Sequence, residues 1–274
     1  MIQKGKHRTS KTEHRTSNTP QTVAALGVGN RMLDYGCRIA LLFLCTLQAT
    51  AASIPNEFKA GAEAYRAGDF ARAAQAFRDA TTQEPASGTL QNLGNAEWQL
   101  GRTGAAILAW EQALWVNPFD KHARNNLRFA RTSAQLDTPE LKWYEAAASW
   151  LPANWWAWIA GASLWLVVGM MTLPGILRWR KSTWQQAVAA LGLGIFLLSI
   201  PAHFGVLTRT RLGFVLEKDT PLRLTPTAEA EAVTRLAAGE PARWVRTRGN
   251  FLFIRTNRNA GWIERGQFGL ICSK

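Results

Sequence analysis

Two long apolar runs dominate the second half of the chain. Residues 155–173 carry almost no polar groups, and residues 187–207 form a second apolar run after a short polar connection. Each run has about the length of a helix that spans a bilayer. Trp155 stands at the front edge of the first run and Trp184 precedes the second, as is typical of aromatic residues at a membrane interface. The pattern predicts a transmembrane hairpin over residues 155–207.

Basic residues give this hairpin an orientation. Arg178, Arg180 and Lys181 lie in the connection between the two runs, where no acidic residue occurs. Lysine and arginine are retained on the cytoplasmic side of a membrane, so both flanking regions are expected outside. The formal net charge of +13 is explained better by these membrane flanks than by a nucleic-acid partner, because no long basic run with interleaved aromatic residues occurs.

A shorter apolar run near the N-terminus indicates secretion. Residues 39–47 follow Arg38 and lead into an A-x-A site, a pattern typical of a signal peptide within residues 1–52. A retained N-terminal anchor is the alternative. The leader before the run is long and polar, which makes Met32 a candidate true start. Cleavage would place Ser53 outside, in agreement with the basic connection of the hairpin.

A repeat with an offset of 33 residues occupies the region between the leader and the hairpin. Small, aromatic and turn-forming positions recur in register: Gly61, Gly68, Ala73, Phe77 and Ala80 correspond to Gly94, Gly101, Ala106, Trp110 and Ala113. This period and punctuation are typical of tetratricopeptide repeats, in which two helices pack against each other through small residues. We expect an all-α array over residues 53–137, in which a helix over residues 120–136 caps two repeats. So short an array is expected to lean on a partner or on the membrane-proximal segment.

The first helices of tetratricopeptide repeats line a concave groove. The matching positions predict a partner-binding groove formed by Tyr65, Asn92, Asn95, Trp98 and Arg128. Asn95 is the candidate that holds the backbone of an extended peptide. The alternative is that these side chains only solvate the concave face.

Two further segments complete the chain. Residues 138–154 are rich in Trp and Ala, and Trp143 and Trp150 are spaced for one helical face. They predict either an interfacial helix or a plain helical linker. Residues 208–274 contain short strand-like runs at 214–216, 222–224, 242–245, 251–254 and 261–263, separated by turn formers. This pattern predicts a small all-β barrel.

The barrel resembles bacterial SH3-type domains. The resemblance is carried by Pro221-Leu222 to Pro226, Gly239, Trp244-Val245 and Gly261-Trp262-Ile263. It implies binding of peptides or cell-wall material. The net +6 of residues 208–274 is compatible with an anionic partner or with ordinary solvated strands.

The order of the segments resembles BatE-type proteins of the bacterial aerotolerance-operon (Bat) family, from Phe58 to Ile271. The most similar stretch runs from Asn92-Leu93-Gly94-Asn95-Ala96 through Trp110-Glu111 to Asn126-Leu127-Arg128. The resemblance implies a multi-domain membrane scaffold in the bacterial inner membrane, with both soluble domains in the periplasm. Its implied partners are other Bat-family proteins with von Willebrand A-type domains and, indirectly, a MoxR-type ATPase. A cell-wall or peptide-ligand sensor that acts through the SH3-type domain is the alternative.

Chemistry-bearing residues do not converge on any catalytic pattern in the sequence. The four histidines are scattered: two lie in the leader, His122 on the predicted capping helix and His203 in an apolar run. No phosphate loop, zinc spacing or nucleophile–base order occurs. Of the three cysteines, Cys37 and Cys45 lie in the leader, so a mature chain would keep only Cys272. We expect no enzymatic activity, cofactor or metal site.

Overall fold

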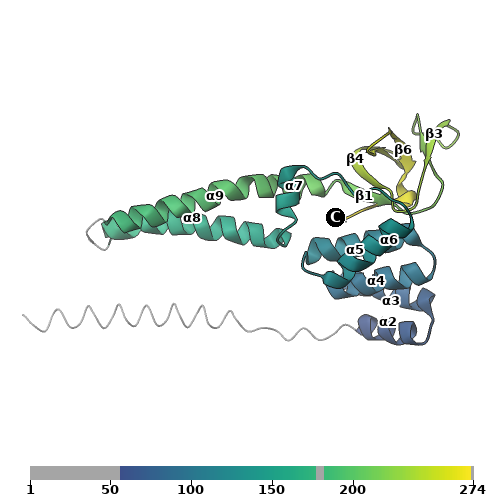
Figure 1. The fold of residues 1–274 in the computed structure, drawn as a ribbon, viewed down its shortest axis with the longest axis horizontal. Coiled ribbons are helices and arrows are strands. Elements are labelled where there is room, and N and C mark those ends of the chain that lie inside the picture. The colour runs from purple at the N-terminus through teal and green to yellow at the C-terminus, as the bar shows by residue number, and fades with distance from the viewer. Residues whose placement is uncertain (1–55, 177–181, 273–274) are drawn as a thin grey trace, which may run out of the picture. The chain divides into compact units, whose positions relative to one another are not determined.

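The computed structural model describes residues 56–176 and 182–272, which belong to one compact unit covering residues 54–274. The predicted signal peptide and the topology residues Arg178, Arg180 and Lys181 lie outside the described residues. The described part begins with five helices in sequence (Figure 1). They are α2 (Asn56–Arg66), α3 (Phe70–Gln83), α4 (Ser87–Gln99), α5 (Thr103–Val116) and α6 (Lys121–Ser133).

The 33-residue offset appears as two helix pairs with the same packing. In the first pair, a Cβ built on Gly61 of α2 would lie 2.8 Å from the ring of Phe77 on α3. In the second, a Cβ on Gly94 of α4 would lie 2.4 Å from Nε1 of Trp110 on α5. Each glycine therefore lets a large aromatic ring lie directly on the backbone of the preceding helix. Both rings and the alanines of the repeat at positions 73, 80, 106 and 113 are buried.

The turns inside the two pairs are built alike. Gly68 and Gly101 have φ of +80° and +73°, in the left-handed region where residues with a Cβ are strained. The next residue differs between the turns. Asp69 accepts a hydrogen bond from the backbone N–H of Arg72 and caps α3, whereas Arg102, 33 positions later, gives α5 no side-chain cap. The second turn thus exchanges an acidic cap for a cation.

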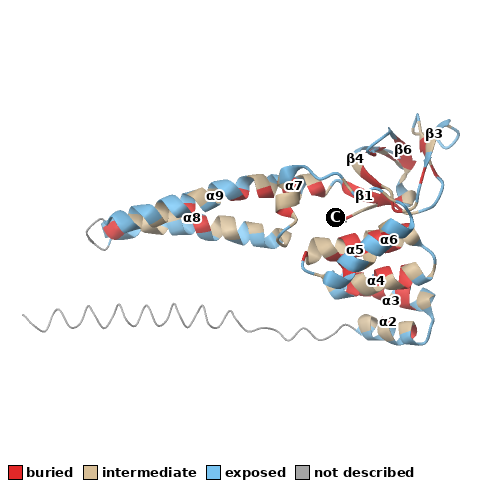
Figure 2. Cartoon of the chain, in the orientation of Figure 1, coloured by how far each residue is buried: buried red, intermediate tan, exposed pale blue. Residues whose placement is uncertain are grey.

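Two long apolar helices follow a short one. Helix α7 (Trp143–Ala148) leads into α8 (Ala153–Ile176) and α9 (Thr183–Arg209), which pack against each other. Among the described residues, α8 and α9 are the helices long and apolar enough to cross a membrane. Most of their apolar side chains face outward (Figure 2), as is expected where lipid rather than protein covers a helix. Within α9, Nδ1 of His203 lies 2.9 Å from the backbone oxygen of Ser199.

The short helix departs from the predicted membrane-proximal helix. Helix α7 ends at Ala148, so Trp150 lies in the turn before α8 and not on one helical face with Trp143. Both indoles are exposed. A Cβ on Gly205 of α9 would lie 2.2 Å from the backbone oxygen of Tyr144, so α7 lies directly on the end of α9. This segment is therefore held by α9.

The C-terminal part is one seven-stranded antiparallel sheet in the order β3-β2-β6-β5-β4-β1-β7. The strands are β1 (Leu212–Val215), β2 (Thr220–Arg223), β3 (Ala232–Leu236), β4 (Pro241–Arg248), β5 (Phe251–Arg255), β6 (Ala260–Glu264) and β7 (Phe268–Leu270). The sequence predicted five of these and missed β3 and β7. A register shift between Trp244 and Arg246 bends β4. The core of the sheet includes Val215, Leu222, Ile254 and Ile263.

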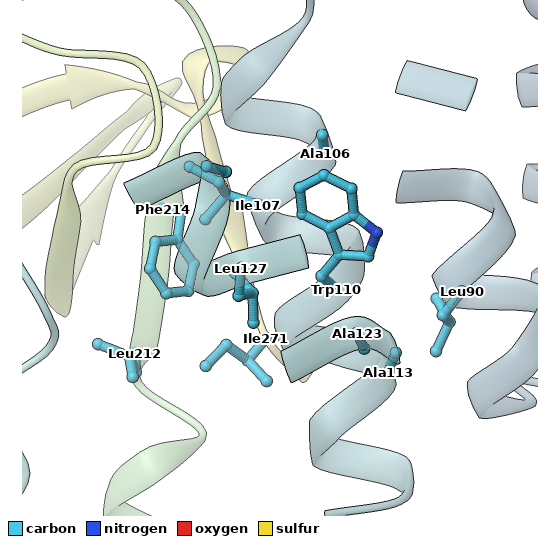
Figure 3. Close-up of a cluster of buried hydrophobic side chains, with 11 residues drawn as sticks. Leu90, Ala106, Ile107, Trp110, Ala113, Ala123, Leu127, Leu212, Phe214 and Ile271 are labelled. Carbon is cyan, nitrogen blue, oxygen red and sulfur yellow. The ribbon is translucent and has the colours of Figure 1, made fainter. Parts of the chain in front are cut away.

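The helical array and the sheet share a second core. Phe214 of β1 and Ile271 join Ile107, Trp110 and Leu127 of α5 and α6 in one buried cluster (Figure 3). Close backbone approaches and a hydrogen bond from Gln112 Nε2 to the backbone oxygen of Leu270, 3.1 Å long, complete this interface. The short array therefore packs against the sheet, a support that the sequence did not predict.

Because the array precedes α8 and the sheet follows α9, this shared core has a topological consequence. The two modules can pack together only if both lie at the same end of the α8–α9 hairpin. The helical array and the sheet therefore form one body, and the α8–α9 hairpin is inserted between them in the sequence.

Candidate functional site

A groove of about 310 Å³ opens between the first helices of the array and α6. Three of the sequence-predicted residues line it: Tyr65 of α2, and Asn95 and Trp98 of α4. They come together because residues 95 and 98 are three apart and share one face of α4. The groove is completed by Gln99, Trp110, Asn126 and Phe129.

Asn95 lies at the centre of a hydrogen-bond network in this groove. Its Oδ1 accepts from Trp110 Nε1 at 3.2 Å and from Asn126 Nδ2 at 2.8 Å. Two donors on one oxygen fix the orientation of the amide, because the oxygen must face both N–H groups. Among the residues that the structure describes, no acceptor takes the Asn95 Nδ2 hydrogens. That group is available to a carbonyl oxygen of a bound chain.

An aromatic ladder forms the apolar part of the groove. The ring centroids of Trp98 and Trp110 lie 5.8 Å apart, and those of Trp98 and Phe129 lie 5.9 Å apart with an edge-on geometry. Trp110 is buried, Trp98 is half-buried and Phe129 is 63% exposed. A ring so exposed loses hydrophobic stabilisation that a partner would restore, and aromatic residues at a concave site are frequent centres of binding energy.

The two remaining predicted groove residues lie elsewhere. Asn92 is half-buried on α4 but does not line the groove. Arg128 lines a neighbouring depression of about 390 Å³ along α6, together with Arg124 and Arg131. Helix α6 carries four cations and no acidic residue, and Arg131 alone among them pairs with a carboxylate, that of Glu111. The arginines of α6 therefore border this second depression, and none of them is among the residues that line the groove.

Phe129 is the main groove residue that the sequence did not predict. The repeat offset compares the two helix pairs, and α6 belongs to neither, so no corresponding position indicated its role. The available signal was a large aromatic residue on the polar side of an amphipathic helix, two positions after the buried Leu127.

A second cluster ties α7, α9 and the sheet together. The buried carboxylate of Glu145 accepts hydrogen bonds from Arg243 of β4 at 2.8 and 2.7 Å and from the backbone N–H of Lys142 at 2.9 Å. Burial opposes ionisation of Glu145, but the hydrogen bonds from Arg243, Lys142 and Thr208 outweigh it, and its pKa lies below the ordinary value of 4.5. The pair is therefore charged at neutral pH.

Arg209, the last residue of α9, makes a further connection. Its guanidinium carbon lies 5.0 Å from the ring centre of Trp115 on α5, a cation–π geometry in a buried setting. Helix α9 thus ends on the helical array, while α7 is fixed to the sheet through Glu145. These contacts hold the soluble body on the hairpin.

Among residues 56–176 and 182–272, no group of three or more His, Cys, Asp or Glu residues is placed to hold a metal ion. No protein-family model matches the chain, and no curated protein matches it either. The groove, with its aromatic ladder and free amide, is suited to holding a segment of another chain.

Proposed function

We propose that the protein is a non-enzymatic scaffold of the bacterial inner membrane, whose helical array is a tetratricopeptide unit that binds a partner protein. The partners proposed are other Bat-family membrane proteins and, through them, a MoxR-type ATPase, in a complex that serves envelope stress or aerotolerance. The single observation that carries the proposal is the groove between α4 and α6, where Asn95 offers free amide hydrogens beside the exposed ring of Phe129.

The residue types of the groove support a protein partner. An amide that offers N–H groups recognises a backbone carbonyl, which every peptide carries. The aromatic ladder gives such a peptide an apolar anchor. This combination favours an extended segment with an apolar side chain over a small metabolite.

The hairpin supports attachment to the membrane. We propose that α8 and α9 span it, with the connection inside and the helical array and the sheet in the periplasm. The joint core of these two modules agrees with this topology, because it requires both on the same side. We also assign the sheet to the SH3-type barrels, on the residues quoted for that resemblance.

Two exposed phenylalanines, Phe129 within α6 and Phe119 in the turn before it, provide a matched test. Phe129→Ala removes the exposed ring of the groove, and Phe119→Ala removes a ring that is 58% exposed and lies outside it. The full chain, purified in mild detergent with Bat-family proteins co-expressed, should lose its partner in Phe129→Ala and keep it in Phe119→Ala. Retention of the partner by both variants would refute the groove as the binding site.

One observation favours the sensor as a second function. The guanidinium carbon of Arg246 lies 5.0 Å from the ring centre of Phe253 and 5.2 Å from that of Trp262, on neighbouring strands. An aromatic–cation cluster on β4, β5 and β6 is suited to contact with a cell-wall ligand. Sedimentation of the chain with cell-wall sacculi, abolished by Arg246→Glu while all protein partners are kept, would support the sensor over the scaffold.

A further inference from the structure

A cavity lined by charged side chains lies between the helical array and the sheet. It measures about 630 Å³ and is separate from the groove at Asn95. One wall comes from the helical array, around the Gly101–Arg102 turn. The other comes from the sheet, through the β1–β2 connection at Lys218 and the β3–β4 connection at Ala237. Neither module alone encloses it.

A buried carboxylate organises the helical wall. Glu97 is 2% exposed and pairs through Oε1 with Arg78 and, at 3.4 Å through Oε2, with Arg102. Two guanidinium groups therefore share one carboxylate. Arg102 is held only by this long contact and is 58% exposed, so most of its donors remain open to the cavity.

The sheet wall adds a third cation. Lys218 is exposed and forms no ion pair with any of the residues that the structure describes. Glu217 beside it accepts a hydrogen bond from Gln267 Nε2 at 3.3 Å. The charged residues on the cavity are thus Arg78, Arg102 and Lys218 against Glu97 and Glu217, which leaves a net charge of +1.

Six further lining residues are apolar, and four of them are alanines. These residues are Ala105, Ala134, Leu136, Leu216, Ala237 and Ala238. A pocket of this size, mostly apolar with a few converging polar groups, is typical of a site that encloses a ligand. The four alanines leave room for a peptide with small side chains.

We propose that this cavity binds a short peptide that ends in a free carboxylate, held by Arg102 and Lys218. A carboxylate fits the planar donors of a guanidinium, and its single negative charge balances the excess of +1. A phosphate dianion would leave uncompensated negative charge next to Glu97 and Glu217. The peptide can come from the end of a partner protein or from a wall stem peptide, because both carry the same carboxylate on an apolar body.

The repeat offset explains how the site arises in only one of the two helix pairs. The turn of the first pair has Asp69, which caps α3, at the position where the second pair has Arg102. The second turn, which lines the cavity, therefore carries a positive charge where the first turn carries a negative one. This site is independent of the groove proposed above, so failure of either leaves the other standing.

The test uses the full chain in detergent and a pair of probe peptides. Acetyl-Ala-Ala-Ala with a free carboxylate should give saturation-transfer NMR signals, and the same peptide with a C-terminal amide should bind at least tenfold more weakly. Inorganic phosphate in excess should not displace the acid. No transfer to the acid, equal binding of acid and amide, or displacement by phosphate would overturn the proposal.

Two variants localise the binding, each with a matched control. Lys218→Glu reverses the unpaired charge, and Ala237→Trp fills the cavity without changing any charge. Both should abolish the signal, whereas Lys59→Glu on exposed α2 and Ala228→Trp on the exposed β2–β3 loop should keep it. Melting temperatures establish that each protein is folded. Signals that persist in folded Lys218→Glu protein would contradict the site.

A second titration identifies the source of the bound peptide. It uses the C-terminal tripeptide of each co-purified partner and a wall stem peptide, and the peptide that binds more tightly is the ligand.

Discussion

Glu145 and Arg243 are 98 residues apart in the chain, and they form a two-pronged ion pair that joins helix α7 to strand β4. Arg243 uses a further N–H to donate to the backbone oxygen of Glu140 at 2.9 Å. The carboxylate is buried, so its charge would destabilise the folded state if Arg243 did not pair with it. The segment that leads into the hairpin is in this way fixed to the sheet that follows it.

Removing this carboxylate should destabilise the protein in a pH-dependent manner. Glu145→Gln leaves Arg243 without its counter-ion, which costs roughly 3 kcal/mol in the free energy of unfolding at pH 7. Because the pKa of Glu145 is lowered on folding, its contribution is complete above pH 4.5 and is lost as pH falls through the lower folded value. Thermal unfolding of both proteins between pH 3 and pH 7 should show a gap that closes on acidification.

Glu140→Gln is the control for this prediction. Glu140 contacts Arg243 only through its backbone oxygen and its side chain is exposed, so its replacement should leave stability within about 0.5 kcal/mol of the wild type. A gap for Glu145→Gln that stayed constant from pH 7 to pH 3 would show that the ionised pair is not its cause.

Gly94 should resist replacement even by alanine. A Cβ there would lie 2.4 Å from Trp110 Nε1, and the ring cannot withdraw because it also donates to Asn95. Gly94→Ala should therefore cost about 1–3 kcal/mol in the free energy of unfolding. Gly88→Ala in the same helix, where nothing lies within 4 Å, should instead stabilise the protein by about 0.5–1 kcal/mol. Equal melting temperatures for the two variants would argue against the packing of α4 on α5.

The shared core makes the helical array depend on the sheet. Phe214 of β1 is fully buried among side chains of α5 and α6, and Phe214→Ala should cost about 3–5 kcal/mol. Hydrogen exchange should then rise in α5 and α6 as well as in β1. Leu224→Ala, at a side chain that is 60% exposed, should change neither. Unaltered protection of α6 in Phe214→Ala would mean that the two modules are stable separately.

Local sequence patterns predicted much of the architecture. The 33-residue offset located both helix pairs, since Gly61 with Phe77 and Gly94 with Trp110 repeat one packing arrangement. The apolar runs located α8 and α9 because lipid-facing helices are apolar on every side. In the groove, Tyr65, Asn95 and Trp98 followed from their place on the first helices of the pairs.

The features of the fold that the sequence did not predict depend on contacts between distant segments of the chain. Helix α5 is apolar on nearly all sides because α4, α6 and the sheet all cover it, but the sequence does not say which element covers which side. Strand β3 has mostly exposed residues and β7 only three residues, so neither gives an alternating pattern. Nothing in the sequence near Glu145 or near Arg243 indicates that the two residues form an ion pair, because they lie 98 positions apart.

Labelling of single cysteines in intact spheroplasts tests most directly whether both soluble modules lie outside the membrane. In a chain whose native cysteines are replaced by serine, Lys59→Cys on the array and Ala228→Cys on the sheet are both exposed positions. A membrane-impermeant maleimide should label both before lysis, and Ser182→Cys at the start of α9 only after permeabilisation. Protection of either module, or labelling of residue 182 from outside, would contradict the account.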